Sequence, residues 1–593
     1  GKPSCDIILI SAGDRKMSDY YEEHFQGLKG IIYREDIPLI SIPDPEGVRV
    51  GNGGAIGNSL LVLKERYEEL KSQYPHLRGR ELKDLRIVLI QAGGFGTRYT
   101  PGSSDGSKTL MPIPVLLPNK KQATMMDFVI MHSYKFTQLL EEDELPGLVV
   151  LNGDGLLITE PRLFDGITLI TNPESIEESA GKLGVVAFDI RTNKIKTFLE
   201  KPSYSEIIEK VKEGILEGVD TKDKESRQLQ TNTASFIVSH SQKEVYAQFL
   251  EAFLEIAQIV KGRIEEKKPV YEIDTSGDYF IPLTVSRRDY LGGKKEGTEE
   301  FYGKIYDIVK GNFPYLFATA TSEDKSYYID YGDVKTWHRG IVKPKPQERI
   351  AGFTERIEAN IERGAEVAKG AKIYRSKIRK DVIVKGEAVV VGSYLYPGSY
   401  VEEGAIVYNI IGEVHPVQDS LINISPITLE NNKIGWAILY TQRGDKLKGE
   451  VRDVKKSFLY SVLERLKSEG IIDYTDSTKL IDLEIWPVQD TFPINFPLVE
   501  WMAQKNNSPP EEYKGAKKVS FRYITKNIDY EGIREREGLL KRQLDGGRYD
   551  EIKRLYQYSI GAFGRELKGK PSCDIILISA GDRKMSDYYE EHF

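Results

Sequence analysis

An apolar residue recurs at every sixth position over residues 361–407, and this spacing limits the folds open to that part of the chain. The positions, with a slip of one residue after the third and the sixth, are Ile361, Val367, Ile373, Ile378, Val384, Val390, Leu395, Val401 and Val407. A six-residue period matches neither a helix nor a flat strand. It is typical of a parallel β-helix, whose coils place one branched side chain inward per face. We assign residues 346–425 to a left-handed β-helix, with an irregular β-meander as the alternative.

Short apolar runs alternate with helical stretches in residues 1–345. Helical segments such as Ser59–Tyr74 and Glu244–Lys267 separate several of the runs. The runs are Asp6–Ser11, Arg86–Gln91, Leu148–Asn152, Ile167–Thr171, Gly184–Phe188 and Ser235–Val238. Continuous Ile, Val and Leu runs of this length favour buried parallel strands. Their alternation with helices predicts a Rossmann-like, doubly wound α/β domain, with its chemistry at the carboxyl ends of the strands.

Beyond the β-helix we expect a mixed α/β region over residues 426–550 and a helical tail with a repeated segment over 551–593. The patterns predict an amphipathic helix at Asp453–Gly470, a loop at Asn506–Lys514 and a charged helix at Tyr530–Lys553. Residues 569–593 repeat residues 1–25 letter for letter. The repeat is either an artefact of assembly or the start of a second tandem copy. Both copies cannot fill one place in a sheet, so we expect one to be loose or paired elsewhere.

Composition excludes several classes of protein. The net charge of −7 over 593 residues argues against a general binder of nucleic acids or membrane surfaces. The chain has no apolar run of 18 residues, and its first residues lack the pattern of a secretory signal. Its only cysteines, Cys5 and Cys573, exclude a disulfide framework and a cysteine-rich zinc site. We therefore expect a cytoplasmic protein without a membrane span.

A glycine-rich loop after the run Arg86–Gln91 carries the strongest chemical signal. It reads Gln91-Ala-Gly-Gly-Phe-Gly-Thr-Arg98, and Gly106-Ser-Lys108-Thr-Leu-Met-Pro follows closely. Glycines let backbone N–H groups approach phosphate oxygens, because no Cβ intervenes. Arg98 can donate to two phosphate oxygens, and Lys108 adds a second positive charge. The pattern predicts a nucleotide site, with a structural turn as the alternative, and its glycine-loop residues are Gly93, Gly94, Gly96 and Thr97.

This loop resembles the signature of the sugar-1-phosphate nucleotidyltransferases, whose other elements follow in the same order. The resemblance implies that Asp154 in Leu151-Asn-Gly-Asp and Asp330 in Tyr328-Ile-Asp bind Mg²⁺. It also implies that Glu200 contacts the sugar, that Lys201 holds its phosphate, and that Asn232 lies beside the sugar. Capping, turn or strand-end roles are the alternatives for the two aspartates and the asparagine, and a solvated surface charge is the alternative for the lysine.

A leading strand and a second glycine loop narrow the resemblance to the L-fucose-1-phosphate guanylyltransferase family. The loop reads Asp44-Pro-Glu-Gly-Val-Arg-Val-Gly-Asn-Gly-Gly54, and Leu480-Ile-Asp-Leu-Glu-Ile-Trp-Pro487 resembles that family's C-terminal part. Gly51, Gly53 and Gly54 form either a second nucleotide-binding loop or a packing turn. Ala55-Ile56 after this loop, and the plain Gly-Thr-Arg of the other, depart from the family pattern and indicate a distant member.

The resemblance implies a reaction of GTP with L-fucose 1-phosphate, with Mg²⁺, that gives GDP-L-fucose and pyrophosphate. Another base or sugar is one alternative, and a non-catalytic regulatory subunit is the other. The presence of a complete charged set favours an enzyme: Arg98, Lys108, Asp154, Lys201 and Asp330. We expect no nucleic-acid or membrane partner and no fused sugar kinase, because the C-terminal part lacks a Gly/Ser-rich phosphate loop. The sequence leaves open whether the chain forms a homo-oligomer and what the C-terminal region does.

Overall fold

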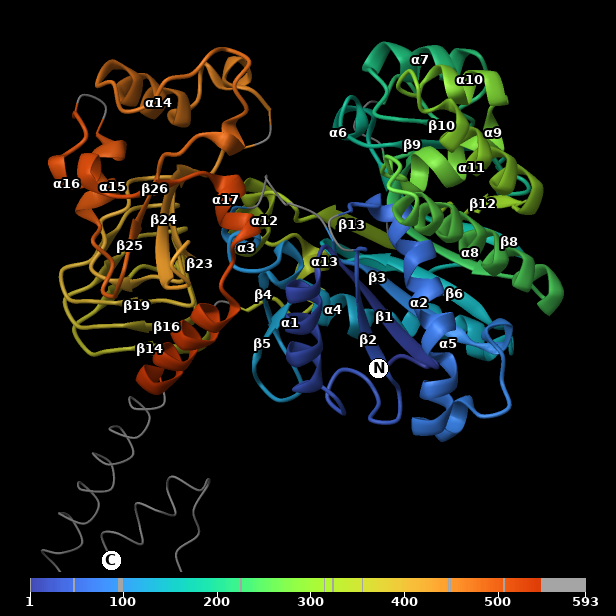
Figure 1. The fold of residues 1–593 in the computed structure, drawn as a ribbon, viewed down its shortest axis with the longest axis horizontal. Coiled ribbons are helices and arrows are strands. Elements are labelled where there is room, and N and C mark those ends of the chain that lie inside the picture. Colours follow the sequence, from blue (N-terminus) through green and yellow to red (C-terminus); the bar gives the residue numbers. More distant parts are fainter. Residues whose placement is uncertain are drawn as a thin grey trace, which may run out of the picture. The chain divides into compact units, whose positions relative to one another are not determined.

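The computed structural model describes residues 2–45, 48–93, 100–223, 227–313, 315–322, 325–354, 356–445, 447, 449–504 and 507–544 (Figure 1). Gly1–Leu540 form one unit of the structure and Lys541–Phe593 form a second. The repeated segment 569–593, and Cys573 with it, lies outside the described residues. Cys5 is a free, buried thiol.

The N-terminal sheet is mixed in strand direction. β2 (Leu39–Pro43), β1 (Ile7–Ala12), β3 (Arg86–Gln91) and β6 (Gly147–Asn152) lie side by side and run parallel. The strands beyond β6 pair antiparallel, except that β12 runs parallel to β8, and they are β11 (Leu229–Ser239), β8 (Gly166–Glu174), β9 (Val185–Phe188), β10 (Ile195–Leu199) and β12 (Leu316–Ala318).

All the strands predicted in residues 1–345 are present, but the prediction of parallel pairing is wrong for β11, which pairs antiparallel with β6, β8 and β9. Continuous apolar runs occur because both faces of a strand are covered, and they carry no information on its direction. Direction depends on how the connecting segments return the chain to the sheet.

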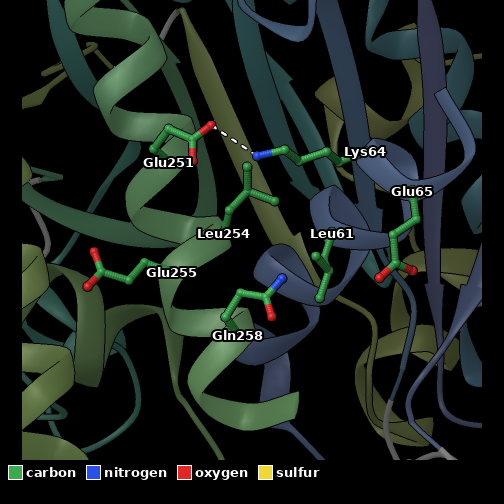
Figure 2. Close-up of a pocket in the computed structure, with 7 residues that line it drawn as sticks. All are labelled: Leu61, Lys64, Glu65, Glu251, Leu254, Glu255 and Gln258. Carbon is green, nitrogen blue, oxygen red and sulfur yellow. Dashed lines mark hydrogen bonds and ion pairs between the residues drawn. The ribbon is translucent and has the colours of Figure 1, made fainter. Parts of the chain in front are cut away.

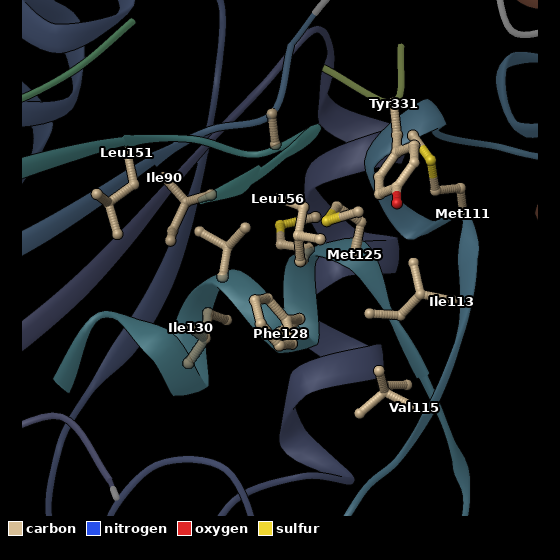
Figure 3. Packing of buried hydrophobic residues seen from close by; sticks show 14 of the residues in the cluster. Ile90, Met111, Ile113, Val115, Met125, Phe128, Ile130, Leu151, Leu156 and Tyr331 are labelled. Carbon is tan, nitrogen blue, oxygen red and sulfur yellow. The ribbon is translucent and has the colours of Figure 1, made fainter. Parts of the chain in front are cut away.

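Helices cover both faces of this sheet, as expected for a doubly wound fold. In β1, Ile8 and Ile10 belong to the core with α1 (Arg15–Gln26) and α4 (Met125–His132), whereas Ile7 and Leu9 belong to the core with α2 (Gly51–Gln73) and α8 (Lys243–Glu265). Successive side chains of a strand point to opposite faces, which separates the two cores. Figure 3 shows the first core, where Ile90 and Leu151 lie near Phe128 and Ile130.

The remaining helices and strands of residues 1–350 lie outside this sheet or connect its strands. They are α3 (Thr100–Ser103), β4 (Pro112–Leu116), β5 (Gln122–Thr124), α5 (Tyr134–Glu142), β7 (Gly155–Thr159), α6 (Ile176–Ser179), α7 (Tyr204–Lys212), α9 (Ile281–Thr284), α10 (Arg287–Gly292), α11 (Glu299–Asn312), β13 (Ser326–Asp330), α12 (Val334–Val342) and α13 (Pro346–Ile350).

Short parallel strands stack in residues 356–412 with a constant offset. Ile361 lies opposite Ile378, and Ile378 lies opposite Leu395, an offset of 17 residues each time. The strands are β14 (Arg356–Ile361), β15 (Glu366–Val367), β16 (Lys372–Ile378), β17 (Ile383–Val384), β18 (Val389–Val391), β19 (Tyr394–Leu395), β20 (Tyr400–Val401), β21 (Ile406–Tyr408) and β22 (Ile411–Gly412).

The apolar period therefore becomes three columns of stacked side chains. One column is formed by Ile361, Ile378 and Leu395, and the other two are Val367, Val384 and Val401, and Ile373, Val390 and Val407. All nine side chains belong to, or pack against, one apolar core. The parallel pairing excludes the meander, and the left-handed winding stays a prediction.

The C-terminal region continues the curled sheet rather than starting a separate one. β23 (Ser420–Thr428) pairs parallel with β21, and β24, β25 and β26 follow it antiparallel. Trp436 and Trp486 share the core of the stacked strands. The remaining bounds are β24 (Ile434–Gln442), α14 (Phe458–Ser468), β25 (Trp486–Gln489), α15 (Pro497–Ala503), α16 (Glu511–Gly515), β26 (Lys518–Val519) and α17 (Phe521–Lys526). The domain boundaries at 345/346, 425/426 and 550/551 stay predictions.

Two of the C-terminal helices predicted from the sequence are present where the structure describes them, and one predicted loop is wrong in part. α14 lies within Asp453–Gly470, and residues 530–544 are helical. The stretch Asn506–Lys514 enters the short helix α16, for which Pro510 is the N-terminal capping residue. A proline can precede or begin a helix because its fixed φ suits the first turn and its missing N–H is not needed there.

The outer face of the stacked strands packs on the N-terminal region. Tyr374, Val389 and Tyr408 share a core with Trp337 of α12, and the rings of Trp337 and Tyr408 lie 6.4 Å apart. The Trp337 indole also donates to the Pro112 carbonyl at 3.0 Å. The N-terminal region of the chain thus covers the apolar outer face of the stacked strands, which would otherwise be exposed to water. None of the described helices is long and apolar enough to cross a membrane.

We predict that Leu395→Ala lowers the free energy of unfolding by about 2–5 kcal/mol, because it leaves a cavity at a fully buried position next to Ile378, which is also fully buried. Urea unfolding followed by tryptophan fluorescence measures the change. Lys369→Ala, in an exposed turn between stacked strands, is the matched control and should change the free energy little. A Leu395→Ala protein as stable as this control would contradict the stacked core.

Candidate active site

A cavity of about 260 Å³ lies at the carboxyl ends of β1 and β3. Gly13 and Asp14 follow β1, and Gly93 follows β3, at the edge of the sheet where an α/β fold places its ligands. The loop after β2 contributes Asp44 and Arg49, and the start of α2 contributes Gly51 and Asn52. The segment before β4 contributes Ser103, Gly106, Ser107 and Lys108. The other predicted residues of the main loop, Gly94, Gly96, Thr97 and Arg98, lie outside the described residues.

The second glycine loop forms the start of α2 and packs tightly against the segment Ile273–Asp274. The Gly53 N–H donates to the Ile273 carbonyl at 2.8 Å, and the Gly54 N–H points to the same oxygen at 3.4 Å. A Cβ at Gly51, whose φ is +77°, would lie 2.5 Å from that oxygen. The N–H groups of Gly53 and Gly54 are therefore used within the protein, which favours a packing turn for these two glycines. Gly51 faces the cavity.

The two predicted metal ligands converge. Asp330 ends β13 opposite Gly155 of β7, the residue after Asp154. A Cβ at Gly332 would lie 2.7 Å from Asp330 Oδ1 and 3.0 Å from Asp154 Oδ2, so both carboxylates face one space that a glycine leaves open. Lys108 donates to Asp154 Oδ2 from the cavity side. Carboxylate oxygens are the ligands that Mg²⁺ prefers, and the pair fits that ion.

The predicted sugar residues form a second group, with Glu200 and Lys201 directly after β10 and Asn232 on β11. A Cβ at Gly184 would lie 3.5 Å from Glu200 Oε2 and 3.8 Å from the Cβ of Asn232, so these two side chains flank the same point. Lys201 Nζ lies 3.5 Å from Glu200 Oε1, and its side chain is 60% exposed. None of the three residues lines the 260 Å³ cavity.

The segment Thr275-Ser276 connects the predicted sugar-binding residues with the cavity. Ser276 Oγ accepts from Asn232 Nδ2 at 2.8 Å, and the Thr275 N–H donates to Asn52 Oδ1 at 3.0 Å. Gln91, at the end of β3, donates to the Asn52 carbonyl at 2.9 Å. This network connects the two groups, and no motif in the sequence indicated it.

A strap formed by residues 100–108, between the main glycine loop and β4, is held by residues from the far end of the chain. Asp105 accepts from Arg536 and from Asn409, each at 2.7 Å. Asn423 donates to Ser104 Oγ at 2.9 Å. Burial raises the pKa of Asp105, against the opposing charge of Arg536. The sequence analysis missed this contact, because Arg536 stands in a highly charged helix that reads as solvated.

Asp44 is a second residue that the sequence analysis did not single out as an ionisable group. It lines the cavity, and burial raises the pKa of its carboxyl to about 7, although Arg49 nearby works in the opposite direction. A carboxyl with such a pKa in a cavity is a frequent mark of a functional site.

A larger hollow of about 540 Å³ lies on the surface between α2 and α8 (Figure 2). Charged side chains rim it, and Lys64 Nζ lies 3.2 Å from Glu251 Oε1. None of the predicted site residues lines this groove. Of the predicted site residues, Gly51, Gly93 and Lys108 line the smaller cavity at the strand ends.

We predict that Asp44→Asn stabilises the protein at about pH 8 and that the gain fades toward about pH 4. The folded carboxyl holds its proton more tightly than the unfolded one, so wild-type stability falls as the pH rises through this interval. Asparagine cannot ionise and escapes that loss. Thermal unfolding of both proteins across this pH range measures the difference. The exposed Asp143→Asn serves as the control, and an equal pH dependence for all three proteins would contradict the assignment.

The sequence is similar to known proteins of one family. The profile of the fucose pyrophosphorylase domain matches residues 79–489. A bifunctional fucokinase/GDP-fucose pyrophosphorylase of Arabidopsis thaliana is 23% identical over 236 residues, which are 35% of this chain and 22% of that protein. A fucose-1-phosphate guanylyltransferase of Mus musculus is 26% identical over 187 residues, which are 29% of this chain and 27% of that protein. The matches thus span about a quarter of the length of these relatives. Because the domain profile covers more than half of the sequence, the chain belongs to the fucose pyrophosphorylase domain family.

Proposed function

We propose that the protein joins L-fucose 1-phosphate and GTP to give GDP-L-fucose and pyrophosphate. The observation that carries this proposal is the cavity at the ends of β1 and β3, where Lys108 binds a buried carboxylate that converges with a second one. Membership of the fucose pyrophosphorylase domain family, and the printed activities of the two relatives, support the choice of sugar and base.

The reaction is a transfer of a nucleotidyl group between phosphates. An oxygen of the sugar phosphate attacks the α-phosphorus in line, and the new P–O bond forms as the bond to the α–β bridging oxygen breaks. Pyrophosphate leaves with that electron pair. The attacking phosphate has a second pKa of about 6 and is anionic near neutral pH, so no general base is needed. Catalysis then consists of positioning and of balancing charge.

The residues near the cavity and the predicted sugar-binding residues would share the positioning and the charge balance. Lys108, with Arg98 of the glycine loop, balances the charge of the triphosphate, and Gly93 lets the backbone approach it. Lys201 holds the sugar phosphate, while Glu200 and Asn232 bind sugar hydroxyls. Asp154 and Asp330 would hold Mg²⁺, which supplies positive charge at the reacting phosphate oxygens.

The described residues include no group of three or more His, Cys, Asp or Glu side chains that could hold a metal ion. Two protein carboxylates are nevertheless sufficient for a magnesium ion that works with phosphates, because Mg²⁺ keeps several waters and takes its other ligands from the substrate. The ion would accordingly bind tightly only together with the nucleotide.

We predict that Asp154→Asn lowers the rate of pyrophosphate release by about 10²-fold or more, because it removes one charge opposite Lys108 and one metal ligand. Asparagine has the same size and preserves the packing at this buried site. Asp490→Asn, at an exposed position outside the cavity, is the control and should keep full activity. Equal melting temperatures of both variants would show that the loss of activity does not come from unfolding. Near-normal turnover of Asp154→Asn would contradict the assignment of Asp154 to the active site.

The substrate assignment is tested by measuring pyrophosphate release with Mg²⁺, L-fucose 1-phosphate and each nucleoside triphosphate in turn. We expect release with GTP in clear excess over ATP, UTP and CTP. Release only with another nucleotide, or only with another sugar phosphate, would keep the reaction class and discard the substrate. No release with any pair would favour a non-catalytic regulatory role.

A further inference from the structure

The C-terminal segment 521–530 reaches the nucleotide cavity. α17 ends at its edge, and Thr525, Lys526 and Ile528 line the cavity together with Gly93 and Lys108. These residues come from the region that continues the curled sheet, whereas the rest of the cavity comes from the first 110 residues. The cavity is therefore shared between two parts of the chain that are far apart in sequence.

The backbone that follows Lys526 is held by several contacts. On β23, the Thr428 N–H donates to the Asn527 carbonyl at 2.8 Å and the Thr428 hydroxyl donates to Asp529 at 2.7 Å. Further along, the ring of Tyr530 packs on Tyr20 of α1, with ring centroids 4.9 Å apart. These contacts hold the end of α17 at the cavity.

The side chain of Lys526 is exposed at this position, where its charge helps to lower the pKa of Asp482. Among the described residues it makes no hydrogen bond and no ion pair, and the nearby Asp482 is bound by Arg522. The other described cations that line the cavity are engaged, since Lys108 binds Asp154 and Arg49 Nη1 lies 3.6 Å from Glu272 Oε1. An exposed ammonium that lines a cavity beside a phosphate loop is suited to bind the anionic end of a ligand.

We propose that Lys526 binds the β- and γ-phosphates of the nucleoside triphosphate, so that the C-terminal region supplies part of the active site. This inference rests on the proposed function, since it takes the cavity for the nucleotide site. It assigns Lys526 to the nucleotide rather than to the sugar phosphate because Glu200, Lys201 and Asn232 do not line this cavity. The same phosphates leave as pyrophosphate, so Lys526 also binds that product.

The test compares Lys526→Ala with Lys517→Ala, an exposed lysine of the same region that does not line the cavity. For Lys526→Ala we expect the KM for GTP to rise on the order of tenfold, with an unchanged KM for the sugar phosphate. Titration calorimetry with GTP and with inorganic pyrophosphate should show a similar loss of affinity. Lys526→Arg should recover part of it, and Lys517→Ala should behave as wild type.

Failure of this inference can be told apart from failure of the proposed function. Wild-type affinity of Lys526→Ala for GTP and pyrophosphate, together with lost turnover of Asp154→Asn, would overturn the role of Lys526 and leave the transferase in place. A raised KM for the sugar phosphate alone would also overturn it. If the wild-type protein released no pyrophosphate with any substrate, the calorimetric comparison of GTP binding would still decide whether Lys526 binds the phosphates.

Discussion

The buried contact between Arg536 and Asp105 ties together three parts of the chain. Arg536 is 1% exposed and comes from the C-terminal helix, Asp105 lies in the strap that leads to Lys108, and Asn409 of the stacked strands donates to the same carboxylate. Charges removed from water are costly unless they are paired and hydrogen-bonded, so neither the strap nor the helix can move away without leaving a buried charge alone. The position of Lys108 at the cavity follows from this constraint.

The carboxylates behind the cavity depend on a similar balance. Asp154 is buried and is compensated by Lys108, and a glycine at position 332 leaves open the space that Asp154 and Asp330 share. Two acidic side chains in one place repel each other, and positive charge relieves that repulsion. The arrangement suits a site whose ligands bring both a cation and phosphates.

The C-terminal region contributes residues to the cavity although it lies more than 400 residues after the other lining residues. Its strands extend the sheet of stacked strands and share their core, so the end of α17 is held by a large apolar body. A rigid support of this kind allows a short segment to present a side chain at a cavity built elsewhere. This support is the structural reason why residues after 520 line the cavity at the ends of β1 and β3.

Periodicity and local motifs determined much of this protein. The apolar spacing from Ile361 to Val407 predicted the three stacked columns, and the alternating runs before residue 345 predicted the doubly wound sheet, because both depend on which side chains must avoid water. The order of motifs also led to Asp154, Asp330 and Lys108, which the fold brings together. Strand direction, the packing turn at Gly53 and Gly54, the Arg536–Asp105 contact and the place of Lys526 were decided only by the tertiary structure. Each depends on which distant segments meet, and no local pattern of residues encodes such a meeting.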